Sequence, residues 1–94
     1  MAEVIHVEGA NKNHKVMLYA LSTCGWCKRT KRLLNNLGVE YDYIDVDLLR
    51  GEERQQTREE VTRWNPMCSF PTIVIDNNKC IAGFKEDEIR EAVS

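Results

Sequence analysis

The chain has 94 residues, a formal net charge of −2 and 30% charged side chains, which predict one soluble domain with a modest core and a single sheet. The weak net charge gives no reason to expect a nucleic acid or an anionic membrane as a partner. The apolar runs are too short for a signal peptide or a membrane span, and four cysteines are too few for a disulfide scaffold, so a reducing, cytoplasmic location is expected.

Residues 1–14 are predicted to form an arm ahead of a domain that covers residues 15–94. Within this arm, the apolar residues 4–7 can add a short edge strand. Residues 9–13 have the composition of a linker, because they contain glycine, asparagine and lysine without an apolar pattern.

A predicted strand at residues 16–21 leads into Cys24-Gly25-Trp26-Cys27, in which two thiols stand three residues apart where a helix begins. This spacing lets the two sulfurs close a small disulfide with little backbone movement. The helix start supplies free N–H groups and a positive dipole end, both of which stabilise a thiolate. A Cys-X-X-Cys pair beside a βαβ pattern is typical of a thioredoxin-like redox centre. Half of a zinc site and a pair of inert structural thiols are the alternatives.

The helix that begins at this motif is predicted to reach Leu37, with Gly38 as the residue that ends it. Its outer face carries the basic residues Lys28, Arg29, Lys31 and Arg32. A strand at residues 39–47 and a very polar helix at residues 51–64 follow, and Asn65-Pro66 stops that helix.

Two further strands, at residues 72–76 and 79–82, are predicted to form a hairpin around the two-residue loop Asn77-Asn78. A last helix covers residues 85–93, with three acidic residues in its first turn. The order β-α-β-α-β-β-α predicts an α/β fold with a four-stranded mixed sheet flanked by helices. Strand 16–21 is expected at the centre because it is apolar on both faces.

The other chemistry-bearing residues give no metal site. His6 and His14 have no cysteine or carboxylate at metal-ligand spacing and are predicted to be surface residues. If Ile75 faces Cys80 in the hairpin, Cys68 lies roughly 23 Å away along an extended chain, well beyond the reach of a disulfide. Cys68 and Cys80 are therefore predicted to stay unpaired, the first as a spectator thiol near the active-site rim and the second in packing.

The chain resembles the glutaredoxins of the thioredoxin superfamily over roughly residues 15–93. The resemblance is carried by Tyr19-Ala20-Leu21-Ser22-Thr23-Cys24-Gly25-Trp26-Cys27, Trp64-Asn65-Pro66, Ser69-Phe70-Pro71-Thr72 and Ala82-Gly83-Phe84. It implies the thioredoxin fold and a thiol–disulfide oxidoreductase that carries electrons to protein disulfides. It also implies a monomer with no bound cofactor.

The resemblance gives the two cysteines different roles. Cys24 is expected to be the exposed nucleophile, which attacks a substrate disulfide, and Cys27 the buried thiol that then resolves the mixed disulfide. Pro71 matches the family's cis-proline beside the nucleophile, where the preceding backbone pairs with an extended substrate. The residues expected to contact the substrate are Trp26, Phe70, Pro71, Gly83 and Phe84.

The basic residues Lys28 and Arg29 are expected to stabilise the thiolate of Cys24 and to attract acidic partners. The alternative is an ordinary solvated helix face.

Departures from the family pattern affect the reductant. Leu21 replaces a lysine that helps to bind the glycyl carboxylate of glutathione, and Lys85 stands where a carboxylate should meet its amine. Ser69 and Phe70 replace a threonine and an aliphatic residue before the proline. These changes favour resetting by a protein reductase, with a glutathione-dependent glutaredoxin as the alternative.

The run Gly83-Phe84-Lys85 is similar to the Gly-Phe-Arg of redoxins that feed ribonucleotide reductase, which makes that enzyme a candidate partner. Two hypotheses from different functional classes are also compatible with the sequence. Because Gly25 stands where some glutaredoxins have proline, one is a [2Fe–2S] cluster held between two monomers by the first cysteine and glutathione. The second is a non-catalytic interaction module.

Overall fold

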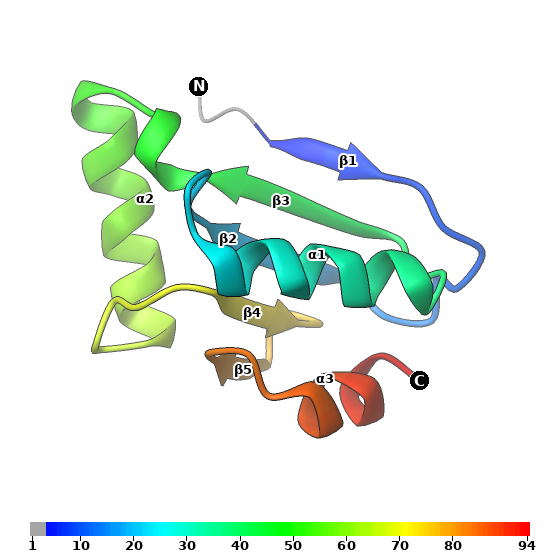
Figure 1. The fold of residues 1–94 in the computed structure, drawn as a ribbon. Coiled ribbons are helices and arrows are strands. Elements are labelled where there is room, and N and C mark those ends of the chain that lie inside the picture. Colours follow the sequence, from blue (N-terminus) through cyan, green and yellow to red (C-terminus); the bar gives the residue numbers. More distant parts are fainter. Residues whose placement is uncertain (1–3) are drawn as a thin grey trace.

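The computed structural model of the protein describes residues 4–94; the first three residues of the predicted arm lie outside this range. Figure 1 shows a mixed sheet with helices on both faces. The elements are β1 (Ile5–Val7), β2 (Val16–Ala20), α1 (Gly25–Asn36), β3 (Tyr41–Asp45), the 3₁₀ turn η1 (Val46–Leu48), α2 (Gly51–Trp64), β4 (Thr72–Ile75), β5 (Lys79–Ala82) and α3 (Glu86–Val93). The predicted thioredoxin-type α/β fold is confirmed.

Within residues 4–94 the sheet has five strands in the order β1-β3-β2-β4-β5, one more than the four expected. The additional strand is β1, which pairs antiparallel with β3 so that Ile5 lies opposite Tyr43 and Val7 opposite Tyr41. Strand β2 is central, parallel to β3 and antiparallel to β4. The strand predicted at residues 39–47 is shorter than expected, because residues 46–48 turn into η1.

The stretch predicted as a linker packs tightly instead. The Asn11 N–H donates to the carbonyl of Gly38, and the Glu40 N–H donates to the carbonyl of Asn11, both at 2.9 Å. A Cβ atom on Gly9 would lie 2.5 Å from the Gly38 carbonyl oxygen, so only glycine fits there. Gly38, with φ at +68°, ends α1 as predicted, and the arm is fastened to the turn that it makes.

The hairpin differs from the prediction by one residue. Ile75 lies opposite Lys79 and Val74 opposite Cys80, so the loop has three residues rather than two. The reason is that Asp76 and Asn77 both adopt left-handed backbone conformations, with φ of +54° and +52°. The predicted pairing of Ile75 with Cys80 is therefore wrong.

Two apolar clusters fix the helices to the sheet. On one face, Leu34 of α1 and Ile89 of α3 are fully buried against strand residues such as Leu18 and Ile73. On the other face, Val61 is the buried anchor of α2, which is otherwise polar. Within residues 4–94, no helix is long and apolar enough to cross a membrane.

Candidate active site

Cys24 is the N-cap residue of α1, at the end of the turn that follows β2. Its side chain is half-exposed, and its Sγ accepts a hydrogen bond from the Cys27 N–H at 3.1 Å. A helix of twelve residues therefore directs an unused backbone donor and its positive dipole end at this sulfur. Such a position suits a sulfur atom that carries negative charge.

Cys27 lies one turn further along α1 and is completely buried. Burial, followed by the hydrogen bond with Cys24, raises the pKa of the Cys27 thiol to about 12. Its thiol therefore stays protonated near neutral pH while Cys24 faces solvent. Solvent therefore reaches the thiol of Cys24 but not that of Cys27. Both thiols are free, as are those of Cys68 and Cys80.

A shallow groove of about 170 Å³ contains all five residues predicted to contact the substrate: Trp26, Phe70, Pro71, Gly83 and Phe84. The indole of Trp26 is 55% exposed and stacks on Phe84, with ring centroids 5.7 Å apart and an angle of 28° between the planes. The Phe70–Pro71 peptide bond is cis, as the resemblance implies. The Gly83 N–H donates to the Pro71 carbonyl at 2.8 Å, which joins the two sides of the groove.

The loop before Pro71 is organised by Asn65, for which the sequence predicts a helix stop but no role in the site. Asn65 is buried, and its amide nitrogen donates to Ser69 Oγ at 3.0 Å and to Thr72 Oγ1 at 3.1 Å. Its amide oxygen accepts from the Met67 N–H. The only sequence signal for this role is an asparagine between a helix end and a proline, which indicates a turn but not its partners.

The loop before Cys24 is held by Asp47, a second residue without a predicted role. The Ser22 N–H donates to Asp47 Oδ1 at 2.8 Å, and the Ser22 hydroxyl donates to Oδ2 at 2.5 Å. These two bonds hold the pKa of the Asp47 carboxyl below its usual range. Arg54 of α2 donates in turn to the Asp47 carbonyl at 3.2 Å, so η1 connects α2 to the cysteine loop.

The basic residues of α1 divide into two kinds. Lys28, Arg29 and Arg32 are exposed, and the Arg29 guanidinium lies 4.9 Å from the ring centroid of Trp26. Lys31 does not belong to the solvated face predicted for it. Its ammonium lies 3.1 Å from Asp45 Oδ1 and 3.9 Å from the centroid of the Tyr43 ring, because β3 passes beside this face of α1.

The two remaining cysteines, Cys68 and Cys80, are also free thiols. Cys68 is half-exposed with φ at +48°, and its Sγ is 3.9 Å from the carbonyl of Arg58. Cys80 lies on the edge strand β5, and partial burial raises the pKa of its thiol. Neither thiol lines the groove around Pro71.

Leu21 and Lys85 are the two residues that stand where the resemblance expects glutathione contacts, and the structure describes the surroundings of both. Leu21 is half-buried against the α2-side core, and Lys85 is exposed at the start of α3 with its ammonium 3.7 Å from a Glu88 carboxylate oxygen. Among residues 4–94, no three His, Cys, Asp or Glu side chains gather as ligands for a metal ion.

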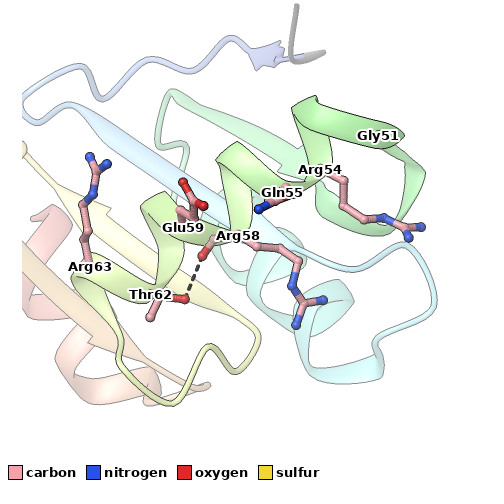
Figure 2. A pocket seen from close by; sticks show the side chains of 7 residues that line it. All are labelled: Gly51, Arg54, Gln55, Arg58, Glu59, Thr62 and Arg63. Atoms are coloured by element: carbon pink, nitrogen blue, oxygen red, sulfur yellow. Dashed lines mark hydrogen bonds between the residues drawn. The ribbon is translucent and has the colours of Figure 1, made fainter.

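A larger surface hollow, of about 780 Å³, lies on α2, away from the cysteine pair in the sequence. Figure 2 shows it along one side of α2, where Arg54, Arg58 and Arg63 project with Glu59 and Gln55. Its lining contains none of the residues that the sequence predicts for the catalytic or substrate-binding site. Its size therefore does not identify it as the redox site.

A central parallel β-α-β unit, a Cys-X-X-Cys pair at the start of α1 and a cis-proline at the start of β4 together define a thiol–disulfide oxidoreductase with the thioredoxin fold. The family model described as Glutaredoxin matches residues 16–81. The chain belongs to the glutaredoxin family.

Individual relatives agree with this assignment. A glutaredoxin-like 8.6 kDa protein of the rubredoxin operon of Clostridium pasteurianum is 32% identical over 78 residues, which are 83% of this chain and 96% of that protein. The crystal structure of a glutaredoxin from Methanosarcina mazei matches with a TM-score of 0.88 and 53% identity over 97% of this chain and 87% of that one. Methanoredoxin from Methanosarcina acetivorans matches with a TM-score of 0.82 and 51% identity, covering 85% of this chain and 84% of its own.

Proposed function

We propose that the chain reduces protein disulfides by a dithiol cycle between Cys24 and Cys27. The observation that supports this proposal most strongly is the inequality of the two thiols. One sulfur is half-exposed at a helix N-terminus, and the other is buried one turn behind it with its pKa raised to about 12. The attacking thiol must be accessible to the substrate, which the position of Cys24 allows. The resolving thiol must stay protonated until the mixed disulfide has formed, which the burial of Cys27 favours.

The cycle balances with two electrons and two protons. The Cys24 thiolate attacks one sulfur of the substrate disulfide, so that a Cys24–substrate disulfide forms and the other substrate sulfur leaves as a thiolate. Cys27 then loses its proton and attacks Cys24 Sγ, which releases the second substrate thiol and leaves a Cys24–Cys27 disulfide. The substrate gains two electrons and two protons, and the protein loses them.

In this proposal the groove around Pro71 holds the substrate chain. Three of its five lining residues are aromatic, and the Trp26–Phe84 stack offers apolar contact close to Cys24 in the sequence. An extended segment on either side of a disulfide fits such a shallow, open surface. The similarity of Gly83-Phe84-Lys85 to the redoxins that feed ribonucleotide reductase makes that enzyme the first protein substrate to test. We place the cycle in the cytoplasm, where one chain acts as a monomer.

For the return of electrons we propose a protein reductase rather than glutathione. A glutathione site needs a cation for the glycyl carboxylate and acceptors for the γ-glutamyl amine. Leu21 offers no charge, and Lys85 places an exposed cation where an acceptor is needed. Each lost contact costs about 1–3 kcal/mol, so glutathione is expected to bind tens of times more weakly than to a glutaredoxin that has both contacts.

The test supplies oxidised protein with glutathione and glutathione reductase, with a thioredoxin-type protein reductase, or with 2-mercaptoethanol as an unselective thiol. The return of the Cys24 thiol is followed by mass spectrometry after alkylation. We expect rapid recovery with the protein reductase. With glutathione, recovery should be no faster than with the unselective thiol.

The double variant Leu21→Lys with Lys85→Asp should raise the glutathione-dependent rate about tenfold or more. A matched control makes the same two kinds of change at exposed positions outside the groove, Leu48→Lys with Lys79→Asp. Efficient glutathione turnover by the unchanged protein would refute the proposed reductant and establish a glutathione-dependent glutaredoxin.

A further inference from the structure

A second groove, of about 310 Å³, lies between α1 and α3 and is basic. Its charged lining consists of Arg29 and Arg32 from α1 and Glu86 and Arg90 from α3, an excess of two positive charges. The whole chain carries a formal charge of −2, so this excess is a local feature and not a reflection of the composition. The three arginines are all exposed.

The positive charge of this groove is largely uncompensated. Glu86 is already bound by Arg90, whose Nε lies 2.9 Å from a Glu86 carboxylate oxygen. Among the residues that the structure describes, neither Arg29 nor Arg32 forms an ion pair or a hydrogen bond, and the Arg29 guanidinium lies over the face of Trp26. Two guanidinium groups are therefore available to an external carboxylate, which guanidinium can bind through two parallel hydrogen bonds.

The basic groove continues the groove around Pro71. Phe84 lines both of them, and its ring stacks on Trp26, which in turn lies under Arg29. A chain that leaves the first groove across the Trp26–Phe84 stack therefore reaches the arginines next. A substrate segment that reacts at Cys24 can therefore also contact the positive charges of the basic groove.

We propose that this basic groove recognises acidic side chains in the substrate segment that carries the disulfide. The inference rests on the proposed function and adds the chemistry of the preferred substrate. Arg29 and Arg32 stand five and eight residues beyond Cys24, roughly 8 and 12 Å along α1. An extended chain advances about 3.3 Å per residue, so the preferred acidic residues lie about two to four positions from the substrate cysteine.

The test uses nine-residue peptides whose central cysteine is joined to 5-thio-2-nitrobenzoate, and follows the release of that coloured thiolate by the reduced protein. Two peptides carry glutamates at the second to fourth positions, on the N-terminal side in one and the C-terminal side in the other. Reference peptides carry glutamine or lysine at the same positions. The readout is the ratio of second-order rates, acidic over glutamine peptide, at low and high salt.

For the unchanged protein, we expect one acidic peptide to react about tenfold faster than its glutamine counterpart at low salt, and less than about twofold faster near 1 M salt. Arg32→Glu should lower this ratio about tenfold and make the lysine peptide the faster one. The matched control is Arg63→Glu, an exposed arginine on α2 at the opposite face of the sheet, which should change the ratio less than about twofold.

Equal rates for both acidic peptides and their glutamine counterparts at low salt would overturn the inference while leaving the disulfide chemistry intact. A loss of preference in Arg63→Glu as large as in Arg32→Glu would overturn it too, because overall charge rather than the groove would then be responsible. Failure to release the thiolate from any peptide would instead overturn the proposed function, and the inference with it.

Discussion

Strand β2 runs between two ends of the molecule that are stabilised in different ways. Beyond Ala20 lie the cysteine loop and the turn before Pro71, organised by hydrogen bonds to Asp47 and to the buried amide of Asn65. Before Val16, exposed ionisable groups hold the chain. There His14 Nδ1 lies 2.7 Å from an Asp76 carboxylate oxygen, and the Lys15 N–H donates to the same carboxylate.

The comparison shows which end of the molecule responds to redox state and which responds to pH. At the Cys24 end, the thiols respond to redox state and the supporting amide of Asn65 carries no charge. The carboxyl of Asp47, whose pKa is lowered below 3.8, stays ionised above that pH. At the His14 end, both partners of the pair are ionisable, and their hydrogen bond raises the pKa of His14 above 6.5 and lowers the pKa of Asp76 below 3.8. Redox chemistry and pH sensitivity are therefore expected to separate along β2, and the following predictions test that separation in order of decreasing effect.

The largest effect is expected from the cysteine pair. Cys24→Ser should abolish disulfide reduction, because no accessible thiol remains at the start of α1. Cys27→Ser should instead accumulate a stable mixed disulfide between Cys24 and the substrate, visible as an added mass that a reducing agent removes. Trapping by Cys24→Ser, with none by Cys27→Ser, would reverse the two assignments.

The next prediction concerns the reactivity of Cys27. With a pKa of about 12, its thiol is over a thousandfold less ionised near neutral pH than an unperturbed cysteine of pKa about 8.5. In the reduced protein, alkylation of Cys27 by iodoacetamide should be very slow at pH 7 and rise about tenfold per pH unit up to pH 10. Peptide mapping by mass spectrometry measures this, with urea-unfolded protein as the control. Labelling of Cys27 as fast as half-exposed Cys68 in the folded protein would contradict the prediction.

A smaller effect is expected from Asn65→Ala. The substitution removes the amide that bonds Ser69, Thr72 and the Met67 N–H, and leaves the buried Thr72 hydroxyl with the Ser69 carbonyl as its remaining partner. We expect a loss of about 2–4 kcal/mol in the free energy of unfolding, measured by urea denaturation. Asn78→Ala, at an exposed loop position, is the control and should change this free energy by less than about 0.5 kcal/mol.

The smallest effect is expected from His14→Ala, and its size depends on pH. Both imidazole nitrogens face acceptors, Asp76 Oδ2 at 2.7 Å and the Ser94 carbonyl at 3.2 Å, so only the imidazolium can donate to both. The bond to Asp76 raises the pKa of His14 above 6.5, and the same bond lowers the pKa of Asp76 below 3.8.

The stabilisation from His14 is therefore complete below pH 6.5 and is lost as the pH rises through its raised pKa. That from Asp76 is present above pH 3.8 and is lost as the pH falls through its lowered pKa. Thermal unfolding of His14→Ala should show a small decrease in Tm at pH 5–6 that nearly vanishes at pH 8.5. An equal decrease at both pH values would mean that His14 acts through packing and not through its charge.

Features set by neighbours in the sequence were predictable. The Cys-X-X-Cys spacing, Gly38 after a helix and Pro71 before a strand each reflect a local backbone requirement, and all three occur where expected. The resemblance also named the five residues that line one groove. The hairpin register was wrong because a left-handed conformation at Asp76 depends on its bonds to Lys15 and His14, about 60 residues earlier.

The contacts that support the site were not predicted for the same reason, because they join residues that are distant in the sequence. Asp47 and Ser22 are 25 residues apart, and nothing beside either residue indicates that they bond. Lys31 carries the pattern of a solvated helix face, and only the passage of β3 beside α1 gives it Asp45 as a partner. Sequence patterns record which groups a backbone segment favours, whereas these contacts depend on how distant segments pack.

Strand β1 also protects its neighbour from self-association. With β1 in place, Asp42 and Tyr43 of β3 are paired on both sides, by β1 and by β2, and Tyr41 is paired with Val7 of β1. A protein trimmed to residues 15–94 would present that row of donors and acceptors to solvent, beside the aromatic rings of Tyr41 and Tyr43. Such a bare edge is a template for sheet-to-sheet aggregation. The solubility of the catalytic unit during expression and storage thus depends on three residues, Ile5–Val7, that lie far from its chemistry.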